Sequence, residues 1–167
     1  FTRSNLYRYF KTKEDIFLKL LAHDITVWRK DIEITFNEEE ESLSDFSIKW
    51  VELLLKHQRM LEMYTILYTL LEKNATLEAL VDFKKSIGAE IALGVERLSK
   101  ILPFLPHEAA LEFLYTSTSL TIGIYPLMDT TEKQKEAMKI AGMEMPPEMV
   151  VKMLESSTLS LLKGLSS

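Results

Sequence analysis

The side chains at the start of the chain have the types and spacing of a nucleic-acid contact. Among the first thirteen residues every charge is positive, and the four bases are Arg3, Arg8, Lys11 and Lys13. Arginine binds guanine edges in the major groove, whereas tyrosine hydroxyls, lysines and helix N-termini bind phosphates. A short helix that carries such donors and ends in a tight turn is suited to the major groove. An ordinary charged surface helix is the alternative.

Helical spacing would position these donors. Thr2 or Ser4 can cap a short helix in which Leu6 and Phe10, four residues apart, face inward. The arginines and a tyrosine are left on the other faces of that helix. A second helix is expected to begin just after Thr12, which is followed by two acidic residues in what would be the first turn.

The charge distribution sets this segment apart from the rest of the chain. The net charge of the 167 residues is −5, but residues 1–30 hold seven bases and three acids, whereas the remainder holds thirteen bases and twenty-two acids. A basic end on an acidic body suggests a partner for that end only, with nucleic acid the leading candidate. The chain has no cysteine, which excludes a disulfide scaffold, a thiol nucleophile and a thiolate metal site.

Apolar residues recur at three- and four-residue steps through nearly the whole chain, which predicts an all-α fold. Five glycines and five prolines are too few for a many-turned β-sandwich or barrel. Helices are expected at 12–36, 42–57, 60–74, 76–101, 107–125 and 148–163. A polar, weakly helical segment at 129–145 is expected to stop at Gly142, and Gly164 is expected to close the last helix.

The stretch at 6–15, LYRYFKTKED, closely resembles the end of the helix-turn-helix signature of the TetR family of transcriptional regulators. In that family a short recognition helix ends in Tyr-x-x-Phe, and a Ser/Thr-Lys-Glu sequence starts the next helix. The resemblance implies a TetR-like fold, with the remnant of a helix-turn-helix domain at 1–20 and a helical effector-binding and dimerisation domain at 21–167. It also implies that the family's first two helices precede residue 1, so this polypeptide is not expected to bind an operator by itself.

The resemblance further implies which residues contact DNA. Arg3 and Arg8 match the variable, specificity-bearing positions, and Ser4 stands where many relatives have glycine. The full set of matching positions is Thr2, Arg3, Ser4, Tyr7, Arg8, Tyr9 and Lys13. The implied function is that of a ligand-responsive repressor, released from operator DNA by a small hydrophobic effector. A helical dimerisation or interaction module with no DNA function is the alternative.

Aromatic and methionine side chains at helical spacing form either a core or the wall of an effector pocket. Within the family the middle helices enclose such a pocket, and adaptable methionines with polar-tipped aromatic residues suit a bulky apolar ligand. The expected pocket residues are Trp50, Met60, Met63, Tyr64, Tyr68, Phe83, Phe113 and Tyr115. Glu90, which flanks an apolar face, either meets a cation or lies at a solvated edge.

A second copy of the chain is expected to cover the helix at 107–125, because apolar or small residues occur all round it. Together with the last helix it would form a four-helix bundle across a two-fold axis, giving a homodimer. The expected interface residues are Leu120, Ile124, Val150, Leu154 and Leu161. Packing of both helices within their own subunit is the alternative.

Nothing in the sequence points to catalysis, a metal or a cofactor. The three histidines, His23, His57 and His107, are far apart and have no metal-ligand spacing, and no nucleophile elbow or Gly-rich phosphate loop is present. The longest apolar stretch without a charge, at 113–128, has sixteen residues and five serines or threonines, so it is too short and too hydroxylated to span a membrane. We therefore expect a cytoplasmic protein that is not an enzyme.

Overall fold

The computed structural model describes residues 10–36 and 42–166, and within these ranges it contains helices and no strand. The predicted all-α fold is thus confirmed. The elements are α2 (Lys13–Thr35), α3 (Leu43–Lys56), α4 (Gln58–Thr65), a π-helical turn η1 (Leu67–Leu71), α5 (Glu72–Asn74), α6 (Leu77–Ile101), α7 (His107–Ile124), a 3₁₀ turn η2 (Tyr125–Leu127), α8 (Glu132–Ala141) and α9 (Pro147–Leu165). Among the helices of the described ranges, none has the length and apolarity needed to cross a bilayer.

Hydroxyl side chains cap the starts of α2, α3 and α6, as predicted. The Thr12 hydroxyl accepts a hydrogen bond from the Asp15 amide at 3.1 Å, while the Asp15 carboxylate accepts one from the Thr12 amide at 3.1 Å. Ser42 and Thr76 cap α3 and α6 in the same way, through the amide three residues on. Each cap satisfies a backbone donor that has no partner inside its helix.

Two predictions about the helices were wrong, one about the continuity of a helix and one about where a helix ends. The expected helix at 60–74 is interrupted, because the amides of Leu70 and Leu71 both donate to the Ile66 carbonyl, at 2.9 and 3.1 Å, and the chain widens into a π turn. Gly164 does not end α9; the helix continues to Leu165, where the Ser166 amide still bonds to the Leu162 carbonyl. Gly142 does end α8, with a left-handed φ of 65°.

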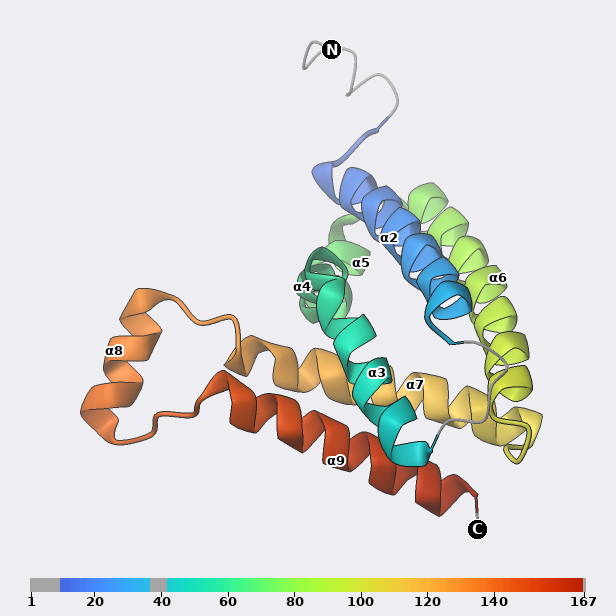
Figure 1. The fold of residues 1–167 in the computed structure, drawn as a ribbon. Coiled ribbons are helices and arrows are strands. Elements are labelled where there is room, and N and C mark those ends of the chain that lie inside the picture. The colour runs from blue at the N-terminus through green and yellow to red at the C-terminus, as the bar shows by residue number, and fades with distance from the viewer. Residues whose placement is uncertain (1–9, 37–41, 167) are drawn as a thin grey trace.

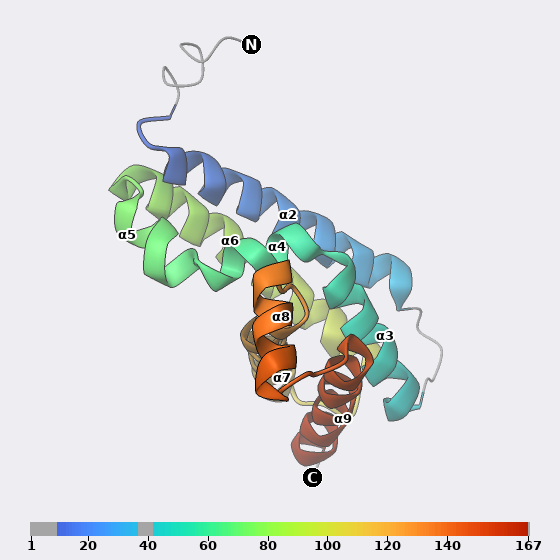
Figure 2. The same ribbon diagram turned by 90° about the vertical axis from the view of Figure 1, so that its left-hand side faces the viewer.

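Helices α2 and α6 lie side by side and run in the same direction (Figures 1 and 2). Hydrogen bonds join three pairs of residues at the starts, middles and ends of the two helices, and the partners in each of these pairs are 61 residues apart in sequence. These pairs are Asp15–Thr76, Arg29–Glu90 and Phe36–Arg97. A constant offset means that the two helices stay in register over their whole length.

The remaining helices pack against one side of this pair. Helices α7 and α9 run antiparallel to each other, α3 crosses α9, and α4 lies between α2 and α7 (Figures 1 and 2). Helix α8 stands away from the body on the arm that joins α7 to α9, and none of its residues is buried. Helices α7 and α9 therefore form a hairpin with α8 on a projecting arm.

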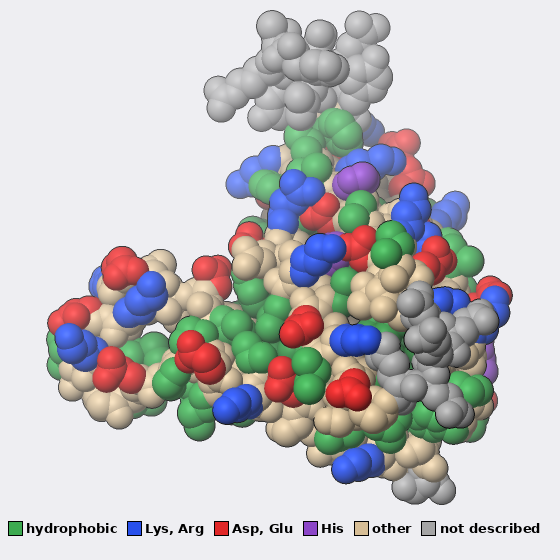
Figure 3. Space-filling view, viewed as in Figure 1, with side chains coloured by type: hydrophobic (Ala, Val, Ile, Leu, Met, Phe, Trp, Pro, Cys, Tyr) green, Lys and Arg blue, Asp and Glu red, His purple; other side chains and the backbone are tan. Residues whose placement is uncertain are grey.

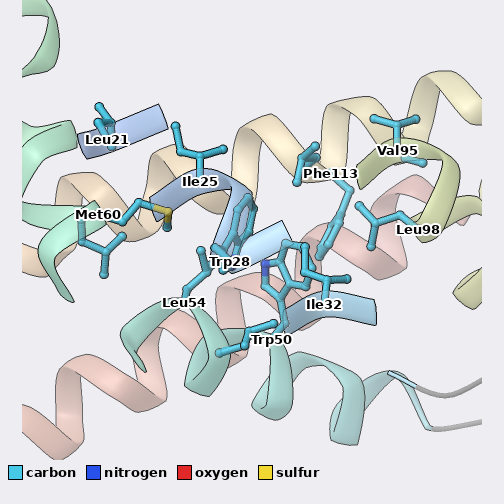
Figure 4. Packing of buried hydrophobic residues seen from close by; sticks show 14 of the residues in the cluster. Leu21, Ile25, Trp28, Ile32, Trp50, Leu54, Met60, Val95, Leu98 and Phe113 are labelled. Carbon is cyan, nitrogen blue, oxygen red and sulfur yellow. The ribbon is translucent and has the colours of Figure 1, made fainter. Parts of the chain in front are cut away.

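The core lies where α2, α3 and α7 meet (Figure 4). Trp50 is completely buried there, and its ring centroid is 5.8 Å from that of Trp28 and 5.2 Å from that of Phe113. The indole nitrogen of Trp50 donates to the hydroxyl of Ser117 at 3.1 Å. This bond satisfies the only polar atom of the buried ring, so Trp50 is a structural residue.

Candidate ligand-binding cavity

A cavity of about 640 Å³ lies between α2, the α4–η1 segment, α6 and α7. Ile25, Ile32, Ile87 and Ile91 are among the residues that give it apolar walls. Its volume falls in the range of small-molecule sites, and such sites combine mostly apolar walls with a few fixed polar groups. The cavity is therefore the candidate ligand site of the described chain.

A second hollow of similar volume lies between the starts of α2 and α6. Its lining includes the charged or titratable side chains of Lys11, Lys19, His23, Glu78 and Asp82. So many ionisable groups favour a wet surface cleft over an apolar binding site. We therefore base the site on the first cavity.

The charged groups of the cavity wall form a closed network. The Glu90 carboxylate accepts from Arg29 Nε at 2.7 Å and, through its other oxygen, from the Thr26 hydroxyl at 2.8 Å. Arg29 also pairs with Glu33. Glu90 thus meets a cation of the same chain, one of the two alternatives left open by the sequence. In the described ranges, no group of three or more His, Asp or Glu side chains could hold a metal ion.

Three tyrosines border the cavity. Tyr68 and Tyr115 are 65% and 53% exposed, whereas Tyr64 is partly buried beneath them. Burial raises the pKa of the Tyr64 hydroxyl, and its two neighbours raise it further, so the phenol stays neutral at any physiological pH. The Nζ atom of Lys84 lies 5.5 Å from the Tyr68 ring centroid. The rim is therefore aromatic and uncharged apart from this lysine, which pairs with Glu72.

Several glycines lie along the cavity wall. Three of the chain's five glycines, Gly88, Gly94 and Gly123, line the cavity, and all three lie inside helices. A Cβ atom added at Gly88 or Gly123 would meet no atom within 4 Å. Glycine inside a helix lowers stability relative to alanine. Helix formation therefore does not explain three glycines along one cavity.

A family profile described as "Tetracyclin repressor-like, C-terminal domain" matches residues 22–167, which is most of the chain. The chain belongs to this family. The TetR family membership that the first residues suggested is thereby confirmed. No curated protein matches the chain. The profile begins within α2, and the domain boundary predicted between residues 20 and 21 falls inside the same continuous helix, where it stays a prediction.

The structure separates the expected pocket residues of this TetR-like chain into two groups. Tyr64, Tyr68 and Tyr115 line the cavity. Trp50, Met60, Met63 and Phe113 lie in the packed core, and Phe83 is buried beside the second hollow. Their periodicity reflects burial, which a core and a pocket wall share, so we do not include these five in the site.

Several cavity residues were missed by the sequence reasoning. Trp28, Arg29 and Thr118 line the cavity but belong to no recognisable motif. The glycines inside α6 and α7 were the signal that could have indicated a cavity, because a glycine within a helical pattern usually has a packing or functional reason.

Most of the expected DNA contacts, Thr2, Arg3, Ser4, Tyr7, Arg8 and Tyr9, lie outside the described residues. Lys13 is described: it occupies the first turn of α2, its side chain is 72% exposed, and its Nζ lies 3.7 Å from Glu14. Lysine and arginine side chains gather around this end of the TetR-like domain (Figure 3). Lys13 is therefore accessible at the surface, and its role as a phosphate contact stays a prediction.

The expected dimer-interface residues also fall into two groups that differ in burial. Leu120, Ile124 and Leu161 are partly exposed, whereas Val150 and Leu154 are completely buried. The buried pair lies on the face of α9 that packs against α3 and α7 of the same subunit. These two residues cannot contact a second copy, and this part of the expected interface has to be corrected.

Proposed function

We propose that this chain is the regulatory part of a ligand-responsive transcriptional repressor. Its cavity binds a small, largely apolar effector, and binding changes how the N-terminal segment meets operator DNA. The observation that carries the proposal is that α2 forms one wall of the cavity and leads directly into the basic N-terminal segment. A ligand against α2 therefore acts on the element that would position the DNA contacts.

Contacts at the start of α2 support this coupling. The Asp15 carboxylate accepts from the Thr76 amide at 2.8 Å and from the Thr76 hydroxyl at 3.1 Å, besides capping its own helix. Burial raises the pKa of Asp15, but the hydrogen bonds from Thr76 and Thr12 outweigh this and leave it below its ordinary value. The carboxylate thus ties the starts of α2 and α6 together, and a ligand that displaces α6 also displaces the start of α2.

A homodimer would place two such segments on the two halves of an operator. The outward stripe of α9 consists of Met149, Met153, Ser156 and Ser160, with Met149 53% and Met153 38% exposed. Small and flexible residues allow a second helix to approach closely. Hydrophobic side chains also gather on the surface between the α8 arm and the body (Figure 3), and Ile140 on the arm is 79% exposed. We propose that a second copy covers this face.

In the dimer, the separation of the two N-terminal segments would decide operator affinity. Recognition elements fit two half-sites only when their spacing matches the repeat of the major groove. An effector that binds better to the mismatched arrangement shifts the population toward it and releases the DNA. Arg3 and Arg8 are then the proposed base-reading residues, while Tyr9 and Lys13 hold phosphates.

The test uses the full-length gene product and fluorescein-labelled DNA from its own upstream region. Fluorescence anisotropy should show binding that decreases when a compound able to displace Nile red from the cavity is added. A Gly88→Phe variant should bind the same DNA but respond to the compound only at higher concentration, because its cavity is partly filled. Ala89→Phe, at an exposed position about 100° further round α6 and outside the cavity lining, is the matched control.

Two results would contradict the proposal. Failure of the full-length product to bind its upstream DNA at low salt would favour a dimerisation module with no DNA function. DNA binding that is equally sensitive to the compound in wild type and Gly88→Phe would place the effector somewhere other than this cavity.

A further inference from the structure

Two hydrogen-bond donors in the cavity wall have no partner. The indole Nε1 of Trp28 and the hydroxyl of Thr118 are buried, and neither has a hydrogen-bond partner among the described residues. The two residues come from different helices, α2 and α7, and both line the same cavity. Buried polar groups are almost always bonded, so two orphans at one cavity require an explanation.

Other buried tryptophan, serine and threonine side chains nearby have hydrogen-bond partners, so the lack of a partner at Trp28 and Thr118 is unusual. The indole of Trp50 donates to Ser117 at 3.1 Å, and Ser117 and Thr121 donate to the carbonyl four residues back, at 2.7 and 2.9 Å. Serine and threonine within helices commonly make this bond. Thr118 lies between them on the same helix and does not. Trp28 and Thr118 therefore differ from their neighbours in having an unbonded hydrogen-bond donor, which is the group that a ligand would use.

The charge of the wall restricts the ligand as well. Three charged residues line the cavity, and each is paired: Arg29 with Glu90 and Glu33, and Lys84 with Glu72. Both carboxylate oxygens of Glu90 are occupied. An anion brought into the cavity would find both of its lysine and arginine side chains already paired, and a cation would find both oxygens of Glu90 already bonded. Burying a charge without a partner is costly.

We infer that the effector is an uncharged, largely apolar molecule with a hydrogen-bond acceptor, such as a carbonyl oxygen, that Trp28 Nε1 and the Thr118 hydroxyl bind. The indole nitrogen can only donate, so the group it meets must be an acceptor. A carbonyl oxygen has two lone pairs and therefore the capacity to accept two hydrogen bonds. This inference rests on the proposed function, in which the cavity is the effector site.

A pair of ligands that differ in one group tests the inference. Benzophenone and diphenylmethane have the same two rings, joined by a carbonyl in one and a methylene in the other. Each is titrated against Nile red bound to the 167-residue chain, and the fall of Nile red fluorescence gives its affinity. In a purely apolar cavity the hydrocarbon binds more tightly, because the carbonyl loses its hydrogen bonds to water. With donors in place we expect benzophenone to bind about fivefold more tightly.

Two variants remove the donors singly. Thr118→Val keeps the shape of the side chain without its hydroxyl, and Trp28→Phe keeps an aromatic ring without the N–H. Each should abolish or reverse the preference for benzophenone while Nile red still binds. Thr116→Val, an exposed position of α7 outside the cavity, should keep the preference unchanged. The anion diphenylacetate should compete at least about tenfold less well than benzophenone.

The outcomes separate the two proposals. Tighter binding of diphenylmethane to the wild-type chain, or a preference for benzophenone that survives both variants, would overturn the inference and leave the cavity as an effector site. Equal competition by diphenylacetate would overturn its claim that the ligand is uncharged. Failure of Nile red and every other probe to bind the wild-type chain would overturn the proposed function itself.

Discussion

Gly88 offers a direct test of whether the cavity is real. It lies in the interior of α6, on the cavity wall, and a Cβ atom at this position meets nothing within 4 Å. Gly88→Ala should therefore gain the helix propensity of alanine at no steric cost. That gain is about 0.5–1 kcal/mol in the free energy of unfolding. For a domain of this size the melting temperature should rise by about 1–4 °C.

Gly88→Phe extends the same change into the cavity. The added side chain occupies about 140 Å³, counting about 20 Å³ for each of its seven carbons in a close-packed interior, against a cavity of about 640 Å³. It also covers about 50–60 Å² of wall that a ligand would otherwise bury. At about 25 cal/mol per Å² this is about 1.4 kcal/mol, or a tenfold loss of affinity. The variant should thus be no less stable than wild type but bind Nile red about tenfold more weakly.

The measurements are thermal unfolding by circular dichroism and Nile red titration on the same samples. Ala89→Phe places the same ring at an exposed position of α6 outside the cavity lining and should leave Nile red affinity unchanged. A lower melting temperature for Gly88→Ala would show that the glycine is required by close packing and that the space is not there. Unchanged Nile red affinity in Gly88→Phe would show that the dye binds elsewhere.

Three further predictions concern the polar network and the dimer. Asp15→Asn should lower stability by about 1–3 kcal/mol at pH 7; because the folded-state pKa lies below the unfolded one, the difference should shrink as urea unfolding is repeated below about pH 4. Glu90→Gln leaves Arg29 with one carboxylate partner fewer, so the unfolding free energy should fall by about 1–3 kcal/mol. Diphenylacetate should also compete better for the cavity. An unchanged anion affinity would mean that Arg29 does not affect which ligand charge the cavity accepts. Light scattering should show a dimer of the 19.3 kDa chain. Met153→Glu should give folded monomers, whereas Leu154→Glu should unfold the subunit. A monomeric wild type at micromolar concentration would refute the dimer.

Features set by a few neighbouring residues could be predicted from the sequence. The starts of α2, α3 and α6 were predicted because a cap needs only Thr12, Ser42 or Thr76 and the amide three residues on. The π turn could not be predicted, since no glycine or proline marks Ile66 and the widening depends on what the segment packs against. Gly164 was misread because glycine permits a helix end without requiring one.

The site was harder to predict than the fold. Helical spacing identifies buried faces, but Trp50 and Tyr64 both satisfy that spacing, and the former packs in the core while the latter borders the cavity. The distinction depends on how α2, α6 and α7 are arranged around the cavity, which is a property of three elements far apart in sequence. The unbonded donors on Trp28 and Thr118 are likewise visible only once every neighbour is in place.

The constant offset between α2 and α6 restricts the motion that a ligand could cause. Sliding one helix along the other by a single residue would break the hydrogen bonds at Asp15, Arg29 and Phe36 together, and the next equivalent alignment is a full turn away, about 5.4 Å. The pair can therefore tilt as one body far more easily than it can shear. From Arg29 at the cavity to Lys13 the axis of α2 is about 24 Å long, so a tilt of about 5° at the cavity would displace the first turn by about 2 Å. A change too small to disturb the core around Trp50 would thus be amplified by distance at the end of the domain that leads to the DNA-binding segment.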